Sequence, residues 1–404
     1  MIPVVVLGGN LNGLGVVRSL AGAGMPIFVA DKGHGCPAAW SRFARFISLP
    51  DVGGRELVKE LINLSCRIGQ RPVLILTADA DVNTVSEFRK ELEPFFRFSL
   101  PAPKMVRSLY DKVQFQLLAE REGLAVPRGV VLESPTDFPL LKTLTFPLAI
   151  KPADKAPLVS NKENDRPVRV ENWDEAIVCA AKMMKRAGRL AVQEWIEGDD
   201  SDLLFSLFAC SSEGELLAHF AGRKLVCIPP AVGITAICAP APEMDEELMR
   251  LSRRFIERVG YKGLGSLEFK RDRHTGKLLI IEPTVGRTDW QEEIATLCGV
   301  NIPLAAYRAE AGIAAKELTK QTSRVMWRSS MLYRLPADVA APGTSLRDGY
   351  FRLNDPLPGL YYYAIELVPL GANRIFRRMG LKGKAAARAH SAGKREQSKL
   401  QLGE

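Results

Sequence analysis

The segment Leu264–Arg287 constrains the fold more than any other part of the chain, because it holds two acidic residues inside two apolar, strand-like runs. Glu268 lies in Ser-Leu-Glu-Phe-Lys, and Glu282 lies in Lys-Leu-Leu-Ile-Ile-Glu-Pro. The residues between the runs, 272–276, have the composition of a hairpin turn. Two adjacent strands can place both carboxylates on one face. There they repel each other unless a cation lies between them or one takes up a proton.

This carboxylate pair has two interpretations. In the first it is a platform for a Mg²⁺–nucleotide complex, because Mg²⁺ prefers oxygen ligands and keeps phosphate oxygens in its shell. Arg287 would then face a phosphate or an oxyanion. In the second, the two acids are simply exposed on a polar hairpin face, and for carboxylates alone this interpretation is favoured. The first gains weight only if lysines elsewhere complete a phosphate site.

Length and cysteine usage limit the class of protein. A chain of 404 residues predicts two or three domains. Seven cysteines without a Cys-x-x-Cys pair favour a reduced cytosol over a zinc ribbon or a disulfide framework. No apolar run approaches about 18 residues, so no membrane span is expected. The first residues, 1–7, are typical of a strand and lack the basic start of a signal peptide. We therefore expect a cytoplasmic protein.

The net charge of +9 is concentrated at the C-terminus. Residues 371–404 contain nine lysines and arginines and two acids, a net +7, which leaves 9 − 7 = +2 for the rest. A nearly neutral body argues against nucleic acid as a partner. The tail has the composition of a partly disordered, solubilising segment. A weak contact with an anionic membrane surface or another acidic partner is the alternative.

The N-terminal part predicts a Rossmann-like half-fold. Strands are expected at 4–7, 26–31 and 73–77, with a glycine-rich turn at 8–15 and a helix at 16–23. The glycines do not follow a clean Gly-x-Gly-x-x-Gly pattern, so we assign them to close packing, with an anion site as the weaker alternative. Asp79 follows the third strand, where it would either face a substrate amine or cap a helix.

The middle of the chain predicts a second α/β unit. Prolines at 101 and 103 mark a boundary, and a helix is expected at 111–122 with Lys112 at its start. Lys151 ends a strand and precedes a polar loop without glycine. A helix at 173–187 and a strand at 190–198 that runs into a hinge follow. A long amphipathic helix is expected at 244–259.

The order of these segments resembles the ATP-grasp superfamily over about residues 1–310. Besides the Rossmann-like start, the resemblance rests on Asp111-Lys112, Ile150-Lys151-Pro152, Gln193–Gly198, Leu267-Glu268-Phe269 and Ile281–Thr284. Each motif alone is weak, and their common order and spacing make the signal. Residues 223–233 are similar to the carboxylate–amine ligases of this superfamily, the group that includes D-aspartate ligase.

The resemblance implies an α/β (α+β) architecture with three parts. A Rossmann-like pre-ATP-grasp domain would span residues 1–100, and a two-lobed ATP-grasp domain would span 101–312. Within the second, a mobile lid at about 126–192 would exclude water from a labile intermediate. An appended region, 313–404, would carry the basic tail.

The resemblance also implies roles for single residues, with ATP and Mg²⁺ (or Mn²⁺) as cofactors. ATP would contact Lys112 and Lys151 with its phosphates, the segment Gln193, Glu194, Trp195 and Ile196 with its adenine, and Asp202 with its ribose. The metal would bind Glu268, Glu282 and Thr284, and the catalytic cations would be Arg287, Arg223 and Lys224. Phosphoryl transfer needs such pre-placed positive charge on several oxygens at once.

Three features depart from the pattern of the superfamily. Thr284 stands where asparagine is usual, so a second metal ion would be held weakly, and Arg287 comes one residue later than usual. The lid loop lacks glycine, and Lys155, Ser160, Asn161 and Lys162 are its candidate substitutes. The residues after 316 have no counterpart in the core of the superfamily.

The implied function is an ADP-forming ligase that joins a small carboxylate to an amine through an acyl phosphate. A carboxylase of the same superfamily that uses bicarbonate is one alternative. A non-catalytic ATP-binding module that acts through its basic tail is another, motivated by Thr284 and the glycine-free lid. The sequence leaves a homodimer open and does not identify either substrate.

Overall fold

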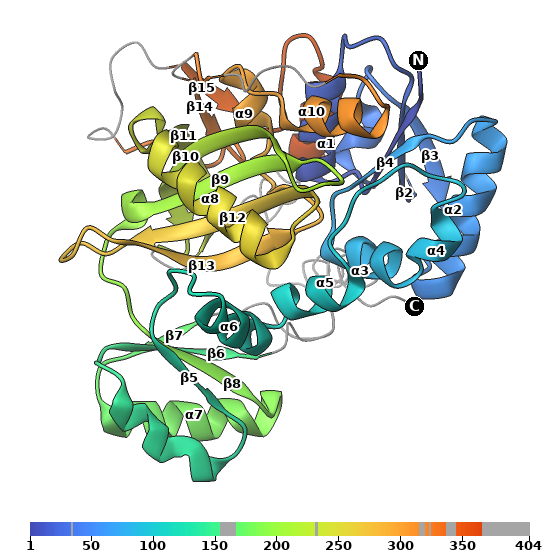
Figure 1. Cartoon of the computed structure of the whole chain (residues 1–404). Helices are drawn as coiled ribbons and strands as arrows, with labels where there is room; N and C mark the ends of the chain where they lie inside the picture. Colours follow the sequence, from blue (N-terminus) through green and yellow to red (C-terminus); the bar gives the residue numbers. More distant parts are fainter. Residues whose placement is uncertain are drawn as a thin grey trace, which may run out of the picture.

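The computed structural model describes residues 1–33, 35–153, 167–230, 233–314, 320–322, 325–336 and 345–365. Three sheets organise these residues, and Figure 1 shows the first and second side by side with the third as a separate lobe. The candidate lid-loop residues Lys155, Ser160, Asn161 and Lys162 lie outside the described residues, as does the basic tail.

The first sheet is parallel, with the order β3 (Arg45–Leu49), β2 (Ile27–Lys32), β1 (Val4–Leu7), β4 (Val73–Leu76). Its helices are α1 (Leu11–Leu20), α2 (Gly54–Ile68), α3 (Asp79–Glu87) and α4 (Arg89–Leu92). The short helix η1 (Pro37–Trp40) follows β2. This confirms the predicted Rossmann-like unit, although α1 begins earlier than expected.

Close packing at the glycine-rich turn explains the early start of α1. Gly8 has φ +94°, and a Cβ added there would lie 2.3 Å from the hydroxyl oxygen of Thr77. A Cβ on Gly13 would lie 2.0 Å from the carbonyl oxygen of Gly8. Only glycine lets the first turn of the helix approach the strand end this closely. The assignment of these glycines to packing is confirmed.

The second sheet forms the centre of the molecule, in the order β13-β12-β9-β10-β11-β14-β15. Its strands are β9 (Leu203–Cys210), β10 (Leu216–Ile228), β11 (Ile234–Pro240), β12 (Gly263–Arg271), β13 (Leu278–Val285), β14 (Val325–Arg328) and β15 (Ser345–Asp348). Its helices are α8 (Asp245–Val259), α9 (Glu293–Leu297) and α10 (Ile302–Glu310), with the short turns η3 (Asp200–Asp202) and η4 (Pro242–Met244). The region after residue 316, predicted to be appended, thus supplies two strands to the central sheet.

The third sheet forms the smaller lobe, in the order β5 (Gly129–Leu132), β8 (Leu190–Glu194), β6 (Leu148–Pro152), β7 (Val168–Val170). Helix α7 (Trp173–Ala187) and η2 (Pro135–Thr143) cover it. Helices α5 (Pro103–Tyr110) and α6 (Lys112–Arg121) connect it to the first unit (Figure 1).

The apolar cores show which parts pack together. Two large apolar clusters each combine residues of the first sheet with residues of the central sheet, as Val5 with Phe269 and Val6 with Phe205. The small lobe has its own core around Leu148 and Leu190. Because apolar burial is the main cohesive force, the first two sheets form one packed body, and the small lobe is held together by a separate core.

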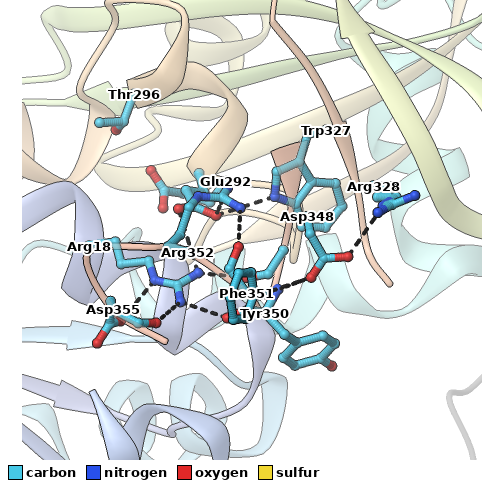
Figure 2. Close-up of polar contacts among 12 residues, drawn as sticks. Arg18, Glu292, Thr296, Trp327, Arg328, Asp348, Tyr350, Phe351, Arg352 and Asp355 are labelled. Carbon is cyan, nitrogen blue, oxygen red and sulfur yellow. Dashed lines mark hydrogen bonds and ion pairs between the residues drawn. The ribbon is translucent and has the colours of Figure 1, made fainter. Parts of the chain in front are cut away.

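Polar contacts fasten the C-terminal segment to α1. Arg18 of α1 donates from Nε to the Asp355 carboxylate at 3.0 Å and from Nη2 to the Tyr350 carbonyl at 2.7 Å. Figure 2 shows this guanidinium between Asp355 and the backbone of Tyr350. Arg352 pairs with Glu293 of α9 at 2.8 Å. The described C-terminal residues are therefore an integral part of the body.

Candidate active site

The two carboxylates that the sequence singled out face each other across the β12–β13 hairpin. Glu268 is the direct cross-strand partner of Glu282, so both side chains lie on the same face. Lys224 of β10 completes the group, with Nζ 2.5 Å from Oε2 of Glu268. Burial alone would lower the pKa of Lys224, but the Glu268 carboxylate outweighs it and raises that pKa. The central sheet thus carries two acidic side chains and Lys224, whose raised pKa favours its charged form.

Lys151 brings the small lobe to the same place. Burial lowers its pKa to about 8, and the positive charge of Lys112 adds to that effect. Glu282 and Glu268 act on the same ammonium in the opposite direction. Electrostatic interactions of this size need short distances. Lys112, Glu268 and Glu282, which come from three other elements, therefore lie near enough to Lys151 to act on its charge.

A chain of buried amides positions Lys151. Its ammonium donates to Oε1 of Gln193 at 2.7 Å, and Nε2 of Gln193 donates to Oε1 of Gln116 at 2.7 Å. Gln116 in turn donates to the carbonyl of Pro127 at 3.0 Å. The side chain of Gln193 thus binds Lys151. The sequence analysis did not identify Gln116. Its signal was an amide one helical turn after Lys112, on a face that is otherwise apolar.

The start of α6 explains the placement of Lys112. The side chain of Asp111 caps the helix by accepting from the amides of Val113 and Gln114 at 2.9 Å each. The same carboxylate pairs with Arg189 at 2.9 Å. The amide of Lys112 donates to the carbonyl of Ala153 at 3.2 Å. Lys112 is therefore fixed against the strand that carries Lys151.

The predicted adenine segment follows β8. The amide of Glu194 donates to the carbonyl of Arg128 and that of Trp195 to the carbonyl of Pro147, each at 2.9 Å. Ile196 is the first residue of this segment whose amide has no backbone partner among the described residues. The guanidinium of Arg169 lies 5.0 Å from the centre of the Trp195 ring. Adenine recognition by this segment stays a prediction, with the Ile196 amide as its available donor.

Asp202 lies in a cluster of charges. Its carboxylate accepts from Arg271 at 2.7 Å and from Arg273 at 3.4 Å. It also accepts from the amide of Asp199 at 3.0 Å, as part of a capping box. These bonds occupy both carboxylate oxygens, so the predicted contact with ribose would need Asp202 to share an oxygen with an arginine.

Arg287 joins the central sheet to the first unit. Its Nε donates to Oδ1 of Asp79 at 2.5 Å, and the Tyr110 hydroxyl donates to the same oxygen at 3.2 Å. Burial would lower the pKa of Arg287, but Asp79 outweighs it and raises that pKa. Asp79, which the sequence analysis expected to face a substrate amine or cap a helix, thus orients Arg287.

The loop after β13 supplies an acid that the sequence did not reveal. Asp289 accepts from the hydroxyl of Thr284 at 2.8 Å and from the hydroxyl of Ser266 at 2.7 Å. The side-chain amide of Asn12 donates to the carbonyls of Thr288 and Asp289, at 2.6 Å and 2.5 Å. The proposed metal ligand Thr284 thus donates its proton to Asp289. No periodic pattern marks this loop in the sequence.

Arg223 requires a correction. It precedes Lys224 in β10, so its side chain leaves the opposite face of the strand. There it pairs with Glu243 at 2.7 Å, next to α8. Lys224 pairs with Glu268 and Arg223 does not, so we leave Arg223 out of the site.

The donor set of the candidate site fits Mg²⁺ bound together with a phosphate. Among the described residues, no group of three or more His, Cys, Asp or Glu side chains is placed to hold a metal ion by itself. Mg²⁺ usually takes one or two carboxylates and completes its shell with water and substrate phosphates. Glu268 and Glu282 would provide those carboxylates.

A second acidic edge lies at the ends of the strands of the first sheet, where open α/β sheets bind ligands. Asp31 accepts from the amide of Gly9 at 2.6 Å. Burial, assisted by the negative charge of Asp31, raises the pKa of Asp81 to about 7.

Comparison with known proteins agrees with this geometry, although no family model matches the chain. D-aspartate ligase of Enterococcus faecium (strain Aus0004) is 22% identical over 322 residues, which cover 74% of each chain. N5-carboxyaminoimidazole synthetase of Staphylococcus aureus has a TM-score of 0.64 at 13% identity and covers 80% of each chain.

A further solved structure has nucleotide bound. The biotin carboxylase domain of Hydrogenobacter thermophilus 2-oxoglutarate carboxylase, a dimer in complex with MgADP, ADP and bicarbonate, has a TM-score of 0.63 at 15% identity. The likeness covers 80% of the present chain and 73% of that one. The fold, the order of the motifs and these likenesses lead to one conclusion: the chain has the fold of these ATP-grasp enzymes and is similar in sequence to a D-aspartate ligase.

Proposed function

We propose that the chain is an ADP-forming ligase that condenses a small carboxylate with an amine. The observation that supports the proposal is that Glu268 and Glu282 are cross-strand partners and that both, like Lys112, act on the charge of Lys151. Two ammonium groups and two acids suited to Mg²⁺ are what a bound triphosphate requires. The likeness to a D-aspartate ligase supports amide formation as the reaction.

The proposed reaction has two steps. A carboxylate oxygen of the substrate attacks the γ-phosphorus of ATP, which forms an acyl phosphate and releases ADP. The amine nitrogen then attacks the carbonyl carbon, phosphate leaves, and the nitrogen loses its proton to give the amide. Lys112 and Lys151 hold the phosphates, and Lys224 and Arg287 stabilise charge on the transferred group. Bound Mg²⁺ would neutralise phosphate charge.

The position of Arg287 supports the carboxylate as its partner. Its guanidinium lies at the junction of the central sheet and the first unit, held by Asp79. A substrate carboxylate at this point would contact a guanidinium whose orientation is already set, which favours a directed interaction over a diffuse one. The acidic edge at Asp31 and Asp81 would suit the amine.

Hydroxylamine trapping tests this mechanism. The purified protein is incubated with ATP, Mg²⁺ and pools of amino acids and other small carboxylates, and released ADP and hydroxamates are measured. We expect ADP release with selected carboxylates and a hydroxamate in place of the amide, because hydroxylamine intercepts acyl phosphates. A Lys151→Gln variant should lose both products. Failure to release ADP or form hydroxamate with any pool would contradict the proposal.

Bicarbonate is the second candidate acceptor, because the biotin carboxylase domain described above has bicarbonate bound. In that case bicarbonate alone should stimulate ADP release by the purified protein. A carboxylated product should then appear when ¹³C-bicarbonate is supplied. If ADP release depends on an organic acid and is unchanged by bicarbonate, this candidate is excluded.

A further inference from the structure

The end of the described chain is a short helix, residues 357–365, that is held firmly on one side. The hydroxyl of Tyr363 lies 2.9 Å from both carboxylate oxygens of Asp348 and accepts from the amide of Met331 at 2.7 Å. The rings of Tyr350 and Tyr362 stack with their centres 3.5 Å apart. Figure 2 shows that Asp348 and Tyr350 belong to the network that reaches Arg18. The orientation of this helix is therefore fixed by the body.

The opposite side of this helix is apolar. Leu357, Leu360 and Ile365 are 51%, 56% and 52% exposed, and the turn before the helix presents Leu353 with 91% of its surface exposed. Leu357, Leu360 and the exposed Ala364 follow helical spacing, so they form one stripe. Ile365 comes directly after Ala364. A surface helix ordinarily turns its polar side outward. Here the outward side is the apolar one, which indicates a partner.

An aromatic pair borders the stripe. Trp40 of η1 is 41% exposed and stacks on Tyr361 with ring centres 4.9 Å apart. Tyr361 occupies the position between Leu357 and Ile365 on the same helix. Tryptophan and tyrosine concentrate where an apolar phase meets water, because their rings combine an apolar body with a polar group.

The sequence that follows the stripe combines cations with apolar residues. Residues 371–404 carry a net +7, and the first basic positions, Arg374, Arg377 and Arg378, are interleaved with Ile375, Phe376 and Met379. An anionic lipid surface binds both features at once, since its headgroups attract the cations and its acyl boundary accepts apolar side chains.

We propose that the apolar stripe of residues 357–365, together with the basic sequence after it, docks the protein on an anionic membrane surface. A second copy of this chain fits less well, because its own basic segment, with a net charge of +7, would repel that of the first. Nucleic acid would use the cations and leave the apolar stripe exposed. Among the described residues, no helix is long and apolar enough to cross a membrane, so the contact would be peripheral.

Vesicle flotation of the full-length protein tests this proposal. The vesicles contain phosphatidylcholine alone or with phosphatidylglycerol, at low and at high salt. We expect flotation only with the anionic vesicles and its loss at high salt. A Leu357→Ser, Leu360→Ser variant should reduce the bound fraction about tenfold, because two apolar contacts are removed. An Arg377→Gln, Arg378→Gln variant should weaken binding similarly.

Matched controls separate this surface from general effects. The Val178→Ser variant removes an exposed apolar side chain of α7. The double variant Arg250→Gln, Arg253→Gln removes two charges from α8. Neither variant should change flotation. Circular dichroism checks that each variant is folded. Equal binding to neutral vesicles, or equal loss with the control variants, would overturn the proposal. So would a stable dimer in light scattering that the leucine variant disrupts while no vesicle is bound.

Discussion

At the scale of single residues, burial changes the pKa of Lys151 in the candidate site. Lys151 is buried, and its pKa falls to about 8 because desolvation and Lys112 both disfavour its charge. The negative charges of Glu268 and Glu282 raise this pKa again, but they offset the lowering only in part. A bound triphosphate adds several negative charges nearby, which favours the protonated form. Binding of nucleotide and protonation of this lysine are therefore linked.

The first prediction concerns that linkage. Lys151 is charged below pH 8 in the free protein and neutral above it. Affinity for a non-hydrolysable ATP analogue should therefore fall as pH rises through 8, by up to about tenfold per pH unit. Calorimetry in buffers of different ionisation enthalpy should detect proton uptake above pH 8. Lys151→Gln should bind weakly with no such pH dependence, whereas the exposed Lys59→Gln should behave as the wild type.

The second prediction concerns the Lys224–Glu268 pair. Lys224→Met leaves Glu268 facing Glu282 without its cation, so we expect the free energy of unfolding to fall by ~1–3 kcal/mol. The added change Glu268→Gln removes the repulsion and should restore most of the loss. Urea denaturation of the two single variants and the double variant gives the coupling. Additive effects would show that the pair does not interact.

At the scale of elements, α1 links the loop after β13 to the C-terminal segment. Asn12 of this helix holds the loop that carries Asp289, and Arg18 holds Asp355. Next to Arg18, the hydroxyl of Ser19 donates to the carboxylate of Glu292 at 3.2 Å. These contacts all come from residues of one helix. A displacement of α1 would therefore disturb the loop after β13 and the C-terminal segment together.

The third prediction uses Glu292, which is fully buried at the start of α9. Burial, with the neighbouring charge of Glu293, raises its pKa from 4.5 to about 8. The folded state therefore prefers the protonated form, so stability should decline as pH rises from about 5 to 8, by about 1 kcal/mol per pH unit. Glu292→Gln keeps an acceptor for Ser19 and should remove this decline. Thermal unfolding between pH 5 and 9 measures it, with the exposed Glu56→Gln as control, and an unchanged pH profile in Glu292→Gln would contradict the assignment.

At the scale of the whole molecule, the separate core of the small lobe matters most. The lobe packs internally through Leu148, Leu190 and their neighbours, whereas its contact with α6 is a small cluster of Val113, Ala153 and Ala191. A lobe with its own core can rotate as a unit without exposing much apolar surface. We therefore propose that residues of this lobe close over bound ATP.

The fourth prediction tests the independence of this lobe. Leu190→Ala opens a cavity in its core and should cost ~2–5 kcal/mol of local stability. Hydrogen exchange should accelerate across β5, β6 and β8 and remain unchanged in β1 and β12. The matched variant Leu61→Ala, in the core shared by the other two sheets, should show the reverse pattern. If Leu190→Ala accelerates exchange equally in all sheets, the lobe is not independent.

The sequence by itself determined the parts that depend on local pattern. Alternating and helical periodicity predicted most strands and helices, and the acids within the 264–285 hairpin indicated its placement and shared face. The order of the lysine and acid motifs, together with the resemblance it carried, pointed to the superfamily. These features are readable because they need only residues that are near each other in the chain.

The tertiary structure decided everything that depends on contacts between distant segments. Arg287 meets Asp79 across 208 residues, and Asn12 holds the loop at Asp289 across 277. Arg223 and Lys224 are neighbours in sequence, yet only packing shows which of them faces Glu268. Gln116 acquires its role from Gln193, and β14 joins the central sheet through β11. Such pairings leave no local periodic trace, because burial and register are set when separate elements pack together.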